Sequence, residues 1–140
     1  MRVTAEDYGP LKAFLAWMAK HVLRVPESLS PEAVLAGFES RSMSTARKGL
    51  GMAVGDIVEM TDRFSAEEVG ALDAALAAEG LPTLSEVRAR FARTIRAIMK
   101  RGNVRSEREF YALRNVVEAM AEPERAEAWR LLGEFESRAR

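Results

Sequence analysis

The stretch of sequence that decides the fold runs from Pro82 to Arg114, PTLSEVRARFARTIRAIMKRGNVRSEREFYALR. Its apolar residues recur at spacings of three and four, which places them on one face of an α-helix. Thr83 followed three residues later by Glu86 is the pattern of a capping box, and Gly102 is the residue type that ends a helix in the left-handed conformation. These features predict one helix over about 84–101. The residues expected on its buried face are Leu84, Val87, Phe91, Ile95 and Ile98.

A second helix is predicted directly after the first. Ser106 and Glu109 repeat the capping-box spacing, and an apolar stripe extends from Phe110 to Met120. Only the short connector 102–105 separates the two helices, so we expect them to form a helical hairpin.

The rest of the chain has the same helical periodicity. We expect a first helix that begins near Pro10, followed by helices over 31–40, 44–63, 66–79 and 123–137. No alternating strand pattern and no Asn-Gly hairpin signal occurs. The sequence therefore predicts a single all-α domain over residues 1–140, a bundle of about six helices.

Three glycines, Gly49, Gly51 and Gly55, lie inside the predicted helix 44–63. Each costs up to about 1 kcal/mol relative to alanine, which indicates a packing reason. We expect Gly51 and Gly55 to let another helix approach closely. The same stretch, GLGMAVG, is similar to a nucleotide-binding loop, but that fingerprint needs a glycine at the position of Val54 and a preceding strand.

The composition argues against several kinds of chemistry. The chain has no cysteine, which excludes disulfides and thiolate chemistry, and a single histidine, His21, which is too few for a usual metal site or base–nucleophile pair. There is no signal-peptide pattern at the N-terminus and no apolar run of membrane-spanning length. We therefore expect a cytoplasmic protein that uses no metal or cofactor and is not an enzyme.

The charge is unevenly distributed along a chain whose formal net charge is zero. Residues 84–114 carry nine Lys or Arg against three Asp or Glu. A basic segment in a neutral protein indicates either an acidic partner or internal pairing with the acidic helices of the same fold. The candidate partner-binding residues are Arg90, Arg93, Arg96, Lys100, Arg101, Arg105, Arg108 and Tyr111.

Nucleic acid is one candidate partner. The helix 66–79, a turn and the Arg-rich helix 84–101 follow one another in the order of a helix-turn-helix, and the arginines could contact phosphates. Against this, only Asn103 and Asn115 are available as amides to read bases, and the apolar spacing across the turn fits the motif poorly.

A protein partner, including a second copy of the chain, is the favoured hypothesis. Trp17 and Trp129 are candidate interface anchors if exposed. The final helix presents Ala126, Trp129, Leu132 and Phe135, and it could either close the bundle or mediate a homodimer.

One segment is similar to known sequences. The elements Arg101-Gly102, Val104-Arg105, Glu107 and Glu109-Phe110-Tyr111 resemble a stretch of small uncharacterised bacterial helical proteins. The resemblance covers about a sixth of the chain and implies no activity. It indicates 101–111 as the place for an exposed constellation of residues. That constellation is Arg101, Arg105, Glu107, Arg108, Glu109 and Tyr111.

Overall fold

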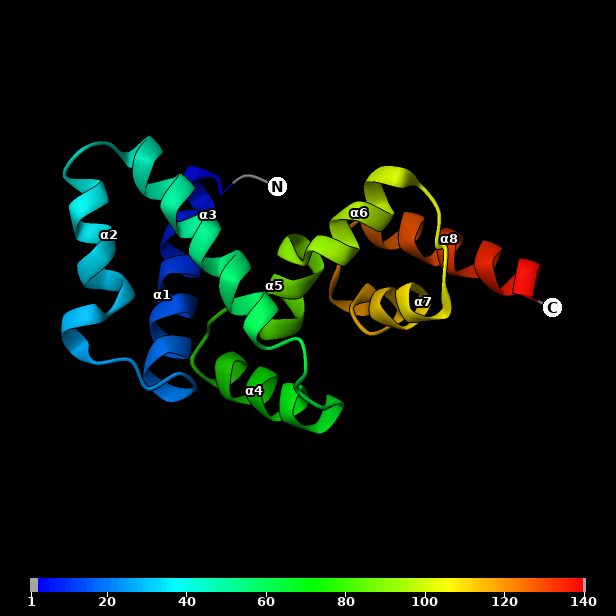
Figure 1. The fold of residues 1–140 in the computed structure, drawn as a ribbon, viewed down its shortest axis with the longest axis horizontal. Coiled ribbons are helices and arrows are strands. Elements are labelled where there is room, and N and C mark those ends of the chain that lie inside the picture. The colour runs from blue at the N-terminus through cyan, green and yellow to red at the C-terminus, as the bar shows by residue number, and fades with distance from the viewer. Residues whose placement is uncertain (1–2, 140) are drawn as a thin grey trace. The chain divides into compact units, whose positions relative to one another are not determined.

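The computed structural model describes residues 3–139, and all regular secondary structure in that range is helical. The predicted all-α class is therefore confirmed, although the described residues form eight α-helices and two short 3₁₀ helices instead of about six helices. The elements are α1 (Ala5–His21), η1 (Glu27–Leu29), α2 (Pro31–Glu39), α3 (Met43–Met60), α4 (Ala66–Ala78), α5 (Leu84–Phe91), α6 (Arg93–Arg101), α7 (Glu107–Arg114), η2 (Val117–Ala119) and α8 (Glu124–Ala139) (Figure 1).

The chain divides into two compact units, the first ending at Thr83 and the second beginning at Leu84. The single-domain organisation stays a prediction, and each unit is described by itself. Their charges differ, because residues 1–83 carry eight Lys or Arg against twelve Asp or Glu, whereas residues 84–140 carry thirteen against nine. The second unit is therefore the basic half of the chain.

The first unit is built on the contacts of α1, α2 and α3 with one another. Phe14, Met18, Leu50 and Val54 are completely buried in it. The expected start of the first helix near Pro10 is wrong. The helix begins at Ala5 because Thr4 and Asp7 form a capping box, and Pro10 lies inside the helix.

The glycines of α3 serve packing at a different position from the one expected. A Cβ atom on Gly49 would lie 3.2 Å from Cδ2 of Phe38, a residue of α2. A Cβ on Gly51 would lie 3.4 Å from Val3, and one on Gly55 would meet nothing within 4 Å. Close approach of a second helix therefore depends on Gly49. The expectation that another helix approaches at Gly51 and Gly55 is wrong, because Val3 precedes α1 and a Cβ on Gly55 has no neighbour.

In the second unit, the predicted helix 84–101 is interrupted at Ala92, whose φ of −64° and ψ of 129° are extended. Neither glycine nor proline marks this position. The interruption separates α5, which packs on η2, from α6, which packs on α7. All five apolar residues predicted for the buried face are nevertheless buried.

A hydrophobic core in the second unit joins α6, α7, η2 and α8. Ile98, Leu113, Val117 and Leu131 are completely buried in it. Gly102 ends α6 with a φ of 82°, the left-handed conformation predicted from its position. This turn sends the chain back from α6 into α7, so the predicted helical hairpin is present.

Candidate functional site

The turn between α6 and α7 is held by the side chain of Arg101. Its Nε donates to Oδ1 of Asn103 at 2.6 Å, and its Nη2 donates to the carbonyl oxygen of Asn103 at 2.9 Å and to Oε1 of Glu109. Arg101 and Glu109 are about four-fifths buried as side chains. A charge-assisted network of this kind stabilises a turn. Arg101 is therefore committed to the fold of the second unit.

Glu109 completes this network in a way that differs from the predicted capping box. Ser106 Oγ accepts a hydrogen bond from the backbone N–H of Glu109 at 3.2 Å, as expected for an N-cap. The carboxylate of Glu109, however, accepts from the backbone N–H of Arg105 at 2.9 Å. The carboxylate of Glu109 therefore binds the N–H of Arg105, the residue before the N-cap, whereas a capping box would have it bind the N–H of Ser106 itself.

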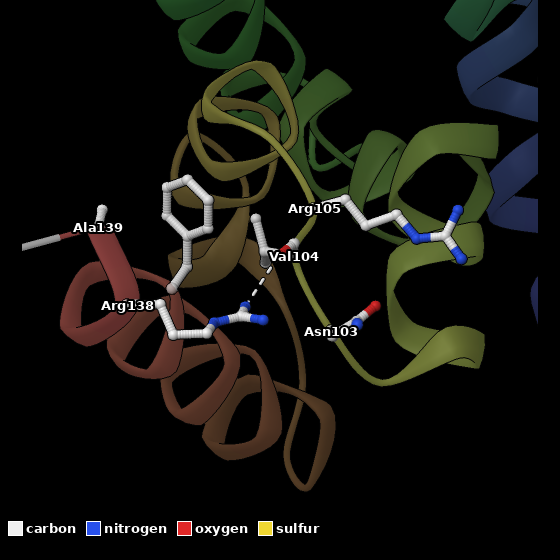
Figure 2. A pocket seen from close by; sticks show the side chains of 6 residues that line it. Asn103, Val104, Arg105, Arg138 and Ala139 are labelled. Carbon is white, nitrogen blue, oxygen red and sulfur yellow. Dashed lines mark hydrogen bonds between the residues drawn. The ribbon is translucent and has the colours of Figure 1, made fainter.

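A small pocket lies where this turn meets the end of α8, with a volume of about 340 Å³. Arg138 reaches across it, and its Nη2 donates to the carbonyl oxygen of Val104 at 2.9 Å. Figure 2 shows Arg105 and Asn103 pointing away from Arg138. The pocket therefore does not bring several cations together, and the Arg138 contact ties the end of α8 to the turn.

The eight predicted partner-binding residues fall into distinct groups. Arg101 is paired with Glu109, and Arg90 and Arg93 also have interaction partners. The remaining cations have exposed side chains, and none of them makes an ion pair within residues 3–139. These unpaired cations are Arg96, Lys100, Arg105 and Arg108.

Exposed aromatic rings mark α7 and α8. Tyr111 is 55% exposed, and Trp129 is 42% exposed with the guanidinium carbon of Arg114 lying 5.0 Å from its ring centroid. Beside them, Phe110 of α7 stacks on Phe135 of α8 with 5.4 Å between ring centroids. Arg114 was not among the predicted site residues. Sequence spacing could not indicate it, because its aromatic partner lies on a different helix.

A polar cluster in the first unit was missed as well. The hydroxyl of Tyr8 donates to Oε2 of Glu39 at 2.6 Å, and Nζ of Lys12 donates to the same oxygen at 2.9 Å. Burial, together with this hydrogen bond and the carboxylate charge, raises the pKa of Tyr8 to about 12. The hydrogen bonds from Tyr8 and Lys12 lower the pKa of Glu39. Because Tyr8 stays protonated, the cluster is suited to linking α1 to α2.

The described residues contain no group of three or more His, Cys, Asp or Glu placed to hold a metal ion. The ring of His21 lies against that of Trp17, with 4.7 Å between the ring centroids and an angle of 34° between the ring planes. The GLGMAVG stretch lies within α3, so it does not follow a strand as a dinucleotide-binding loop requires. None of the described helices is long and apolar enough to cross a membrane.

Comparison of the chain with protein-family models, with curated proteins and with solved structures finds no match.

Proposed function

We propose that this protein acts by binding, without catalysis, as a cytoplasmic homodimer formed through α8. The observation that carries the proposal is the exposed indole of Trp129 with the Arg114 guanidinium on its face. Tryptophan and arginine are the residue types most enriched at the energetic centres of protein interfaces. A tryptophan left 42% exposed represents a large apolar area that a partner would remove from water.

The surface of α8 is suited to pairing with its own copy. Trp129 and Gly133 are four residues apart and both exposed, so a bulky ring and a position without a side chain lie next to each other on one helix face. A Cβ atom on Gly133 would meet nothing within 4 Å, and Gly133 also lines an open hollow of about 660 Å³. In an antiparallel pair of α8 helices, each indole would pack over Gly133 of the other copy. Such reciprocity is what a two-fold interface requires.

The charged residues beside this face suit the same arrangement. Arg130 pairs with Glu127 and Glu134 of its own helix, and Arg114 lies over the Trp129 ring, so two cations and two carboxylates surround Trp129. A balanced surface avoids the like-charge repulsion that a two-fold interface between identical basic or acidic patches would create.

The test is the molar mass in solution by light scattering across a wide protein concentration range. We expect the unaltered chain to form dimers and Trp129→Ala to remain monomeric, because truncation of a hot-spot tryptophan costs 2 kcal/mol or more, a factor of about thirty in affinity. Trp17→Phe serves as the control, because Trp17 lies on α1 of the first unit. A dimer that persists in Trp129→Ala would exclude this face as the dimer interface. An unaltered chain that is monomeric at every concentration would exclude the homodimer and assign the α8 face to a different protein partner.

A further inference from the structure

We infer that the second unit carries a separate surface for single-stranded nucleic acid, formed by the unpaired cations of α6 and the following turn together with Tyr111. We name it the α6–α7 cationic surface, and its residues are Arg96, Lys100, Arg105, Arg108 and Tyr111. It shares no residue with the face proposed for dimerisation, which comprises Trp129, Gly133 and Arg114.

Helix α6 contains no carboxylate side chain. Its nine residues, RTIRAIMKR, include four cations and no Asp or Glu. Arg96 and Lys100 lie one turn apart on the exposed side, opposite the buried Ile95 and Ile98. Like charges at this spacing destabilise an isolated helix by a few tenths of a kcal/mol. An anion bound from outside would convert this repulsion into attraction.

In α8 and the segment before it, by contrast, two arginines are paired with carboxylates. Arg125 pairs with Glu122 at 2.8 Å, and Arg130 pairs with Glu127 and Glu134. The same unit therefore neutralises Arg125 and Arg130 of α8 with carboxylates three or four residues away, and it leaves Arg96 and Lys100 of α6 without an ion pair in the described residues. General arginine richness does not explain this difference.

The cationic surface continues past the turn between α6 and α7. Arg105 and Arg108 are exposed and, like Arg96 and Lys100, form no ion pair in the part of the chain that is described. Figure 2 shows the Arg105 side chain extending away from Arg138. Two other cations near the turn are excluded from this surface because they already have partners. Arg101 binds Glu109, and Arg138 donates to the carbonyl oxygen of Val104.

The exposed ring of Tyr111 favours nucleic acid over an acidic protein as the partner. Tyr111 follows Arg108 by one helical turn and exposes 55% of its surface, so an aromatic ring stands beside the cations. Proteins that hold single strands combine a positive surface with aromatic rings on which bases stack. Few side-chain amides are available to recognise specific bases, because Asn103 Oδ1 already accepts a hydrogen bond from Arg101. Binding is therefore independent of base sequence and favours single strands over duplex.

The experiment measures fluorescence anisotropy of a labelled mixed-sequence DNA single strand, and of its duplex, with the full chain across a salt titration. Four phosphate contacts predict a slope of log K against log salt of about −3 for the single strand. Arg96→Gln with Lys100→Gln should weaken binding roughly tenfold at low salt and bring the slope to about −1.5. Tyr111→Leu should weaken single-strand binding about tenfold and leave duplex binding unchanged.

The matched control is Arg125→Gln with Arg130→Gln, which removes the same charge from α8, where both arginines are already paired. It should change affinity less than twofold, and Trp129→Ala should also leave it unchanged. No binding at low salt, or an equal loss in the control, would overturn the inference. Competition by polyglutamate as effective as by DNA, with no effect of Tyr111→Leu, would assign the surface to an acidic protein instead.

Discussion

Gly49 and Gly55 form a matched pair that tests the packing of α2 on α3. Both lie inside α3, so replacement by alanine removes the same backbone penalty of about 1 kcal/mol at each position. At Gly55 the new methyl group meets nothing within 4 Å, so the gain should be retained. At Gly49 it would lie 3.2 Å and 3.3 Å from Cδ2 and Cε2 of Phe38, so the ring must move. Overpacking of this kind costs about 1–3 kcal/mol.

The free energy of unfolding should therefore rise by about 1 kcal/mol in Gly55→Ala and stay level or fall in Gly49→Ala. Chemical denaturation followed by circular dichroism measures both, with an unchanged denaturant slope as the sign that only stability has altered. The double variant Gly49→Ala with Phe38→Leu, compared with Phe38→Leu alone, should recover the helix gain because the clashing ring is gone. Equal gains in the two single variants would refute the contact between Gly49 and Phe38.

Three further predictions concern charge. Because folding raises the pKa of Tyr8, this hydroxyl ionises at a lower pH in the unfolded chain than in the folded one. The stability that it contributes should be fully present below about pH 10 and fall as the pH rises toward 12. Tyr8→Phe should remove this loss in denaturation curves measured across that range. Arg101→Ala should cost about 1–2 kcal/mol in chemical denaturation because it removes a part-buried network. Arg130→Ala, which removes an exposed pair, should cost clearly less, and equal costs would contradict the structural role of Arg101. Arg96→Glu with Lys100→Glu should leave thermal stability nearly unchanged, since neither cation is paired in the described structure, and a large loss would show that the α6 face is packed.

The sequence was informative where local rules decide the structure. The apolar spacing from Leu84 to Ile98 identified residues that are all buried, and Gly102 was correctly expected to end a helix in the left-handed conformation. The extended backbone at Ala92 could not be anticipated, because alanine is the best helix former. Its conformation follows from tertiary packing, which can override helix propensity.

The face of α8 was misjudged for a geometric reason. The four residues Ala126, Trp129, Leu132 and Phe135 are spaced by three, and each such step rotates about 60° short of a full turn. The series therefore winds away from any single face. The buried face instead contains Ala128, Leu131 and Leu132, which leaves Trp129 exposed.

The candidate sites were only partly accessible from the sequence. The list of basic residues could not separate the paired Arg101 from the unpaired Arg96, because the pairing depends on how the turn places Glu109. The bond between Tyr8 and Glu39 joins residues 31 positions apart, and no local pattern reports it.

The most direct test of dimerisation through α8 is sedimentation equilibrium of the unaltered chain beside Gly133→Gln. Glutamine is a better helix former than glycine, and a Cβ at this position meets nothing within 4 Å, so the substitution should stabilise the monomer. The new side chain would also occupy the space proposed for the partner's indole. The account predicts that the unaltered chain approaches twice its 15.5 kDa mass and that the variant stays near 15.5 kDa. A single-chain mass for both proteins, or a dimer unaffected by Gly133→Gln, would contradict it.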